Sequence, residues 1–301
     1  MKEGHFQILN QCPLKRTRGV IMNRKTRKHI ISMVIRGIPL IVFTMFIMIP
    51  LLWAVSMSFK ENGVILSGKF SILPHPATLA NYAYVWVRNN FGIYFFNSML
   101  ISLCSVFFII NMVIWNGYAL TRFAFRGKNV IMVALLMTST VPVMLNLTSI
   151  YMLIKNLGLM DTRIGIVMLN IAGGLAFNTL LMRGFMAGIP KEMDEAALID
   201  GCNNFQVIYQ IITPVAKPGI VTILIYAFVG CWNEYLMSFI LLSSQKKFPI
   251  SVGLRYFIGE FTTDYASLAA GSIIALIPPL LLFGYVQKHL VGGLSVGAVK
   301  G

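Results

Sequence analysis

About six apolar runs, each long enough to cross a lipid bilayer, constrain this chain more than any other feature of its sequence. They fall at 38–58, 94–119, 130–153, 164–182, 220–242 and 268–287. A composition of 57% hydrophobic and 12% charged residues excludes a soluble protein. Backbone groups inside a bilayer must find hydrogen-bond partners within their own segment, which favours helices. We therefore expect an all-α polytopic membrane protein with about six transmembrane helices.

The net charge of +15 is explained by membrane orientation and not by a nucleic-acid surface, because the basic residues are not gathered with aromatic side chains. Roughly 17 of the 25 Lys and Arg residues lie on one side of the expected spans. A cluster immediately precedes the first span, at Arg24, Lys25, Arg27 and Lys28. Positive charge collects on the cytoplasmic side of membrane proteins. We therefore expect both termini in the cytoplasm, in a multi-pass protein of the cytoplasmic membrane.

An acidic, polar segment at 189–220 interrupts the apolar pattern between the fourth and fifth expected spans. Four of the ten acidic residues lie in it, at Glu192, Asp194, Glu195 and Asp200. Such a concentration of charge is incompatible with a lipid-facing surface. The expected topology places this segment in the cytoplasm.

Two short helices are expected within this segment. Pro190 suits the first turn of a helix, and the carboxylates that follow oppose the positive end of its dipole. Gly201 is the expected left-handed residue that ends this helix. Asn203 or Asn204 can then cap a second helix, which Pro214 closes.

One face of the first helix has the character of a docking surface. Met193, Ala196 and Ala197 recur at the i, i+3, i+4 spacing, and the small alanines let another backbone come close. The alternative is an acidic surface loop that merely joins two spans.

Further motifs follow in order along the chain. They are NSMLIS (97–102), YALTRFAFRGK (118–128), IYMLIKNLGLMDT (150–162), MRGFMAGIPKE (182–192), WNEYL (232–236) and GLSVGAVKG (293–301). Within 189–220, Glu195, Ala196 and Ala197 precede Asp200, Gly201 and Pro214. From about residue 35 to the end, this arrangement resembles the maltose-type carbohydrate permease subunits of bacterial ABC importers.

The resemblance implies the type I ABC-importer permease fold with cytoplasmic coupling helices. In that family the EAA loop, here 184–219, fits into a cleft on a separate ATPase subunit. The residues that the resemblance assigns to ATPase coupling are Glu195, Ala196, Ala197, Asp200, Gly201, Phe205 and Pro214.

The resemblance also implies partners. They are a second homologous permease subunit, two ATP-binding subunits and an extracellular solute-binding protein that delivers a sugar or oligosaccharide. ATP and magnesium would bind to the partner ATPases, so this chain would bind no cofactor and would not be an enzyme. The binding protein and the second permease would share the choice of sugar.

The expected organisation has four parts. A basic cytoplasmic tail covers 1–35, with Met1 and Met22 both open as the functional start. The first transmembrane helix and an outer loop follow at 36–92, the ABC permease core at 93–290, and a cytoplasmic C-terminal tail at 291–301.

The sequence contains no recognisable ATP-hydrolysing site or catalytic centre. GVILSGK at 63–69 approaches a phosphate-binding loop, but Phe70 stands where Ser or Thr must ligate magnesium. His5, His29, His75 and His289 are scattered without metal-ligand spacing, and no catalytic triad can be assembled from them. We expect no metal site.

Polar residues inside the expected spans are candidates for a substrate path, because polar groups are costly in lipid. Glu234 is the strongest, and the alternative for it is a bond to its neighbours or to a helix end. The other candidates, for which bonding between helices is the alternative, are Asn233, Asn178, Asn170, Asn146 and Thr140. Uncharged hydrogen-bonding groups of this kind suit hydroxyl-rich substrates.

Prolines and outer charges add two further expectations. Pro142 in the third span, and Pro278 with Pro279 in the sixth, are expected to break backbone hydrogen bonds and permit bends. The charged residues of the outer segment 243–265 are candidates for docking a binding protein, and the alternative is that the segment is a solvated loop. These residues are Lys246, Lys247, Arg255, Glu260 and Asp264.

Two other functions are alternatives to sugar import. An ABC importer permease for a non-sugar solute would share every feature of the hairpin. A self-powered secondary transporter would need an ion-coupling constellation and often internal repeats, whereas the spans hold one carboxylate and no clear repeat.

Overall fold

The computed structural model describes residues 24–68, 71–259 and 262–297. Most of the expected N-terminal tail, the last residues of the C-terminal tail, and Lys69, Phe70 and Glu260 lie outside these ranges. Within them the chain is helical and has no strand, apart from one isolated bridge between Ile258 and Thr263. The expected all-α class is therefore confirmed.

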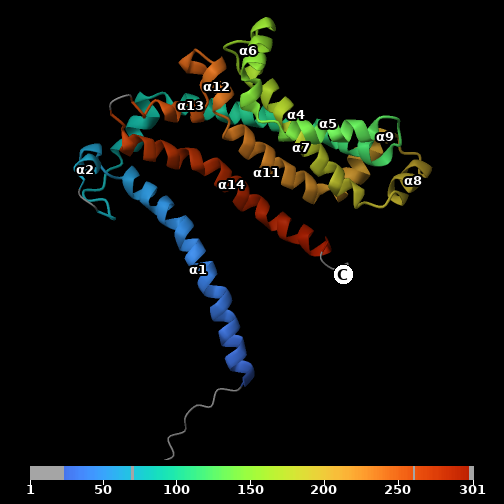
Figure 1. Cartoon of the computed structure of the whole chain (residues 1–301), viewed down its shortest axis with the longest axis horizontal. Helices are drawn as coiled ribbons and strands as arrows, with labels where there is room; N and C mark the ends of the chain where they lie inside the picture. Colours follow the sequence, from blue (N-terminus) through green and yellow to red (C-terminus); the bar gives the residue numbers. More distant parts are fainter. Residues whose placement is uncertain (1–23, 69–70, 260–261, 298–301) are drawn as a thin grey trace, which may run out of the picture. The chain divides into compact units, whose positions relative to one another are not determined.

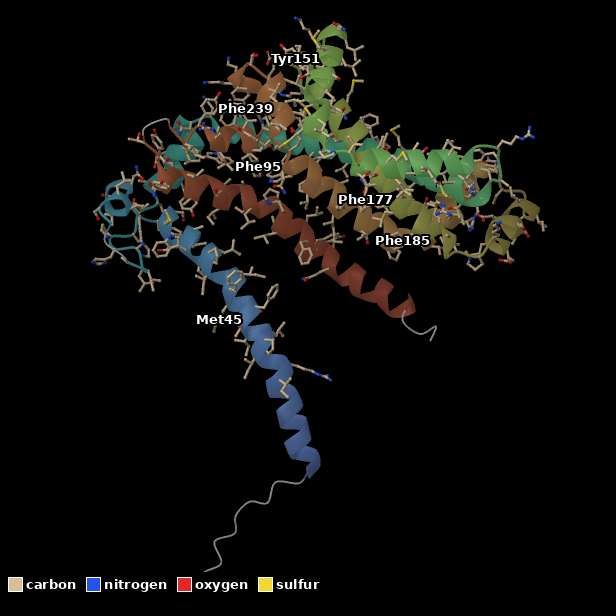
Figure 2. All side chains as sticks on the ribbon, in the orientation of Figure 1. Met45, Phe95, Tyr151, Phe177, Phe185 and Phe239 are labelled. Atoms are coloured by element: carbon tan, nitrogen blue, oxygen red, sulfur yellow. The ribbon has the colours of Figure 1, made fainter. Side chains whose placement is uncertain are left out.

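The chain divides into two units, residues 1–52 and 53–301. The first contains most of α1 (Arg24–Ser58), whose apolar part begins at Ile35, close to the expected span. Its side chains are open to the surroundings, with Met45 60% and Phe46 75% exposed, and Met45 is labelled in Figure 2. An apolar helix with this exposure is suited to face lipid.

The second unit holds the other long apolar helices, which run through the core in Figure 1. They are α4 (Phe91–Arg122), α7 (Arg163–Ala187), α11 (Lys217–Trp232) with α12 (Leu236–Leu241), and α14 (Tyr265–Gly297). Shorter elements connect them: α2 (Asn62–Leu66), α3 (Ala80–Ala83), η1 (Tyr84–Arg88), η4 (Gln245–Lys247) and α13 (Ile250–Arg255). Long apolar helices with exposed side chains such as Phe177 and Phe239 are the material of membrane spans.

The third expected span, 130–153, is not one straight helix. α5 (Lys128–Thr140) ends at Val141, whose backbone is extended, and the chain bends by 93° before η2 (Val143–Asn146) and α6 (Leu147–Asn156). Pro142 lacks an N–H and forces the residue before it out of the helical region. Five helices of the described chain can therefore cross a membrane, or six if this bent pair counts as one span.

The sixth span contains its two prolines within one helix. α14 continues without interruption through Pro278 and Pro279. Transmembrane helices tolerate proline because neighbouring groups can satisfy the carbonyls it leaves free. The bend expected here is not accompanied by a break in the helix.

α4 and α7 pack against each other at the centre of the second unit. A Cβ atom added at Gly117 of α4 would lie 2.6 Å from Cγ of Met182, and one at Gly174 of α7 would lie 2.8 Å from Cδ1 of Ile109. Glycine at both positions permits this approach, as small residues do between membrane helices. The two helices thus form the axis to which the functional regions are attached.

Candidate functional site

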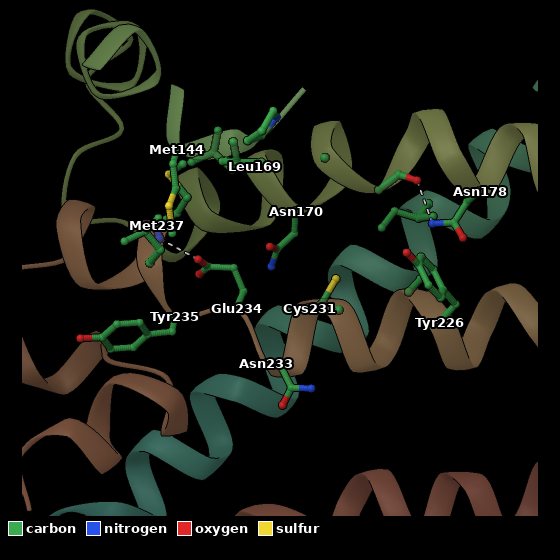
Figure 3. Close-up of a pocket in the computed structure, with 18 residues that line it drawn as sticks. Met144, Leu169, Asn170, Asn178, Tyr226, Cys231, Asn233, Glu234, Tyr235 and Met237 are labelled. Carbon is green, nitrogen blue, oxygen red and sulfur yellow. Dashed lines mark hydrogen bonds between the residues drawn. The ribbon is translucent and has the colours of Figure 1, made fainter. Parts of the chain in front are cut away.

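A cavity of about 680 Å³ lies beside this axis, lined by α4, α7, α11, α12 and the bend at Pro142. Four of the six candidate substrate-path residues line it, namely Asn170, Asn178, Asn233 and Glu234 (Figure 3). The other two do not. Thr140 donates its hydroxyl to the Met137 carbonyl at 2.9 Å within its own helix, and Asn146 is exposed at the end of η2.

The Glu234 carboxylate caps α12. Its oxygens accept hydrogen bonds from the backbone N–H of Met237 at 2.6 Å, the N–H of Ser238 at 3.1 Å and the Ser238 hydroxyl at 2.5 Å. α11 ends at Trp232 and α12 begins at Leu236, so the first amides of α12 need partners from outside the helix. This geometry agrees with the alternative expectation for Glu234, a bond to a helix end. Although Glu234 lines the cavity, its carboxylate is hydrogen-bonded to the start of α12.

Two buried amides at the cavity have unused hydrogen-bonding atoms. Asn178 donates Nδ2 to the Gly174 carbonyl at 2.7 Å, but its Oδ1 has no partner among the described residues. Nδ2 of Asn170 is buried and likewise has no partner there. A buried polar atom without a partner costs about 1–3 kcal/mol. Both unpartnered atoms belong to uncharged amides of residues that line the cavity.

Sequence reasoning missed Tyr226 and Tyr235, which also line the cavity (Figure 3). A signal for Tyr226 was present, because Tyr226, Gly230, Asn233 and Glu234 follow the i, i+4, i+7, i+8 spacing of one helix face. Read together, the tyrosine and the polar pair would have marked this face of α11 as the cavity side.

The acidic segment folds as the predicted helical hairpin. α8 (Glu192–Ile199) starts two residues after Pro190, and Gly201 follows it with a φ of 88°, which is the predicted left-handed stop. Asn203 caps α9 (Asn204–Gln206): it accepts the Gln206 N–H at 2.9 Å, and the Gln206 side chain accepts the Asn203 N–H at 2.8 Å. The glycine stop and the asparagine cap are therefore confirmed, whereas Pro190 lies before α8 and not in its first turn.

Pro214 does not close the second helix as expected. η3 (Val207–Ile212) continues α9 with wider turns, and α10 (Thr213–Val215) follows, with Pro214 in its first turn. The missing N–H of proline does no harm at the start of a helical segment. The hairpin therefore extends to Val215, directly before α11.

The exposed face of α8 differs from the expected docking face. Ala197 is buried at 6% exposure, together with Asp194, whereas Glu195 and Ala196 are exposed. The position of Ala197 is a correction: Asp194 lies three residues before it on the same face and turns that face toward the core. The residues that the hairpin presents outward include Glu192, Glu195, Ala196, Leu198, Ile199, Asp200, Gly201, Phe205 and Pro214.

An ion pair attaches α8 to the end of α4. Arg122 Nε lies 2.5 Å from Asp194 Oδ2, and the two side chains are only 7% and 9% exposed. Arg122 also donates Nη1 to the Ile189 carbonyl at 3.0 Å. Burial raises the pKa of the Asp194 carboxyl, and the Arg122 charge opposes this rise.

A second attachment joins α4 to the other arm of the hairpin. Trp115 donates Nε1 to the Tyr209 hydroxyl at 3.0 Å, and that hydroxyl donates to Asn111 Oδ1 at 3.2 Å. The Phe205 ring lies 4.6 Å from the Tyr209 ring and 6.0 Å from the Trp115 ring, between centroids. Each arm of the hairpin is thus connected to the same long helix.

A clamp at the opposite end of α7 was not predicted. Asp161 Oδ1 accepts the N–H groups of Ser243 and Ser244, both at 2.9 Å, and Oδ2 accepts the Ser244 hydroxyl at 2.6 Å and Lys247 Nζ at 2.7 Å. The hydrogen bonds from Lys247 and Ser244 lower the pKa of the Asp161 carboxyl. Lys247, one of the charges of the outer segment, is bound through its ammonium to Asp161, and this pairing was not predicted.

Known proteins share the sequence pattern of this chain. Residues 113–296 match the family described as "binding-protein-dependent transport system inner membrane component". The diacetylchitobiose uptake system permease protein NgcG of Streptomyces coelicolor is 31% identical, over 87% of this chain and 87% of its own length. The maltodextrin transport system permease protein MdxG of Bacillus subtilis is 34% identical, over 68% of this chain and 74% of its own length.

A solved bacterial ABC transporter involved in the import of the acidic polysaccharide alginate contains a chain of the same fold. That chain superposes with a TM-score of 0.74 at 24% identity, covering 89% of this chain and 98% of its own length. With long apolar helices, a mainly apolar cavity that includes four of the candidate polar residues, and a helical hairpin in place, the chain belongs to the inner membrane components, or permeases, of binding-protein-dependent ABC transport systems.

Proposed function

We propose that this permease moves an uncharged sugar or oligosaccharide across the bacterial cytoplasmic membrane. The observation that carries the proposal is the pair of unused amide atoms at the cavity, Asn170 Nδ2 and Asn178 Oδ1. A sugar hydroxyl both donates and accepts hydrogen bonds, so it can satisfy both atoms. The Glu234 carboxylate caps α12, so it is not free to bind a charged solute in the cavity. The names of the diacetylchitobiose and maltodextrin relatives point to the same substrate class.

The chain works as one subunit of a larger importer. A second homologous permease would complete the substrate path, an extracellular solute-binding protein would deliver the sugar, and two ATP-binding subunits would hold ATP and magnesium. In this arrangement the chain binds no cofactor and carries no ATPase activity of its own. The family description, which names a dependence on a binding protein, supports this division of labour.

The hairpin is the coupling element that meets an ATPase subunit. Its exposed face presents Glu195 and Ala196 beside Ile199, which is 86% exposed, and a large exposed apolar residue among acids suits a protein partner. Closure of the ATPases would move the hairpin. The ion pair at Arg122 and the hydrogen bond at Trp115 would pass that movement to α4, whose residue Ile109 lines the cavity.

The orientation follows from the same assignment. Both termini and the hairpin would lie in the cytoplasm, and the clamp around Asp161 would lie on the outer side. ATP binding would then drive the spans from an inward-facing to an outward-facing arrangement, and hydrolysis would reset them.

Uptake by the reconstituted complex tests the proposal. The sugar is first identified as the one that raises the melting temperature of the cognate binding protein. Vesicles containing this permease with its partner subunits should then accumulate that sugar only when ATP is supplied, and vesicles containing this chain alone should accumulate none. Uptake of an amino acid in place of any sugar would assign the permease to a non-sugar solute, and uptake by the chain alone would contradict the coupling.

Charge reversal at Glu195 tests the hairpin. Glu195 is exposed and has no ion pair or side-chain hydrogen bond with any residue that the structure describes, so Glu195→Lys should abolish ATP-driven uptake and leave the amount of protein in the membrane unchanged. The matched control is Lys155→Glu on α6, an exposed charge reversal far from the hairpin in sequence. Full uptake by Glu195→Lys would count against docking at this face.

A further inference from the structure

A second cavity, of about 400 Å³, lies where α4 and α7 end and α5 and the hairpin begin. Four of the side chains that line it are cationic, those of Arg122, Lys128, Arg183 and Lys191, and one is anionic, that of Glu192. Arg122 is neutralised by Asp194. The remaining three cations face a single carboxylate, so the cavity has an excess of positive charge.

The cations are available for a ligand. Among the described residues Lys128, Arg183 and Lys191 take part in no ion pair. Nε of Arg183 is buried and has no hydrogen-bond partner there, and Lys128 makes one long bond of 3.2 Å to the Phe123 carbonyl. A buried guanidinium nitrogen without an acceptor is costly, and an anion with several oxygens would relieve that cost.

The position of the cavity indicates which anion. Arg122 is the last residue of α4, Lys128 is the first of α5, and Arg183 lies one turn before the end of α7. The ends of membrane-spanning helices lie at the level of the lipid headgroups. On the same helices, within three residues of Lys128 and Arg183, Val130 and Ile131 of α5 and Phe185 of α7 are 71%, 45% and 38% exposed, and Phe185 is labelled in Figure 2. Exposed apolar side chains on helices that end at a cationic cavity suit acyl chains below a phosphate.

We propose that this cavity binds the phosphate of an anionic phospholipid at the hairpin end of the molecule. The phosphate oxygens would accept hydrogen bonds from Arg183, Lys128 and Lys191, and the first turn of α5 adds the positive end of a 13-residue helix. The cavity also touches Pro190 at the base of the hairpin. A bound headgroup would therefore brace the junction between the spans and the hairpin, whatever solute the permease carries.

Lipid retention measures this site. The full chain is placed in nanodiscs of phosphatidylcholine with phosphatidylglycerol, extracted in mild detergent, and weighed by native mass spectrometry. The wild type should retain phosphatidylglycerol in preference to phosphatidylcholine, and Arg183→Gln should retain about fivefold less, since each basic residue near an anionic membrane surface contributes about that factor. Arg183→Lys, which keeps the charge, should retain most of the binding, and Lys155→Gln on α6 should behave as the wild type.

The alternatives give distinct results. Retention of neither lipid, together with displacement of a bound anion by inorganic phosphate, would assign the same cations to a soluble phosphate. Equal retention of phosphatidylglycerol by Arg183→Gln and Lys155→Gln would overturn the proposal. Unchanged lipid retention with loss of ATPase binding in Arg183→Gln would also overturn it, because the cavity would then serve the partner subunit.

Discussion

Two aspartates at opposite ends of α7 each join segments that are distant in the sequence, but they do so in different surroundings. Asp194, after α7, is buried with its side chain 9% exposed and pairs with Arg122. Asp161, before α7, is 27% exposed and accepts bonds from two backbone amides, a hydroxyl and an ammonium. One attachment depends on a single desolvated ion pair, whereas the other is spread over several partners.

The surroundings move the two pKa values in opposite directions. Burial raises the pKa of Asp194, and hydrogen bonds to Lys247 and Ser244 lower that of Asp161. By linkage, the contribution of Asp161 to stability is present above its unfolded pKa and is lost as the pH falls through its lowered value. The contribution of Asp194 has the opposite sign and falls as the pH rises through its raised value. Ionisation of the acid is therefore favoured by the fold at Asp161 and disfavoured by it at Asp194.

The largest effect is expected from breaking the buried pair. Asp194→Ala should lower the free energy of unfolding by about 3–5 kcal/mol, because Arg122 would remain buried without a counter-charge. Glu195→Ala, the neighbouring exposed acid, should change it by less than about 0.5 kcal/mol. Chemical unfolding in detergent measures both, and the double variant Arg122→Met with Asp194→Leu should recover most of the loss. Equal costs at positions 194 and 195 would remove the distinction between buried and exposed acids.

A smaller cost is expected at the clamp. Asp161→Asn should lower the free energy of unfolding by about 1–3 kcal/mol at pH 7, because the amide keeps one oxygen to accept the Ser243 and Ser244 N–H groups but its NH2 cannot accept from Lys247 or from the Ser244 hydroxyl. Lys247→Gln should follow in the same direction, and Lys246→Gln, one residue away and without an ion pair among the described residues, serves as the control.

The pH dependence sharpens the clamp prediction. The difference in melting temperature between the wild type and Asp161→Asn should be constant near neutrality and shrink as the pH falls below about 4, the ordinary pKa of an aspartate. A difference that grows on acidification would reverse the assigned direction of the pKa shift.

Substitutions in the cavity beside α7 should change substrate binding and not the free energy of unfolding. Asn178→Ala should raise the KM of uptake by about tenfold, equivalent to one lost hydrogen bond of about 1.4 kcal/mol, without changing the ATPase rate. Asn146→Ala, an exposed asparagine outside the cavity, is the matched control. A loss of folding stability in Asn178→Ala at unchanged KM would instead identify the amide as a bond between helices.

The smallest effect concerns the second attachment of the hairpin. Tyr209→Phe removes the hydroxyl that joins Trp115 to Asn111 and should cost about 0.5–1.5 kcal/mol. If this contact passes movement to α4, the number of ATP molecules hydrolysed per sugar transported should rise in the variant. Tyr151→Phe, whose hydroxyl has no hydrogen-bond partner among the described residues, should leave that ratio unchanged. An unchanged ratio in Tyr209→Phe would leave Arg122 and Asp194 as the single route to α4.

Short sequence signals predicted much of the local structure correctly. The lengths of the apolar runs located the spans, Gly201 stops α8 with a positive φ, and Asn203 caps α9. Pro142 was expected to permit a bend, and the chain does bend there by 93°, but a hydropathy window does not contain the size of that bend. The face of α8 was misassigned for a related reason: helical spacing groups Met193, Ala196 and Ala197, but the partner of Asp194 decides which side is buried.

Hydropathy, helix caps and glycine stops act over a few residues, so the order of the amino acids is enough to specify a helical membrane protein with an acidic helical hairpin between two spans. The role of each polar side chain depends instead on how the helices pack. Packing directed Glu234 to the end of α12, left Asn170 and Asn178 with unused atoms at a cavity, and joined Asp194 to Arg122 and Asp161 to Lys247. The pairing of buried polar groups depends on segments that are far apart along the chain, and only packing brings them together.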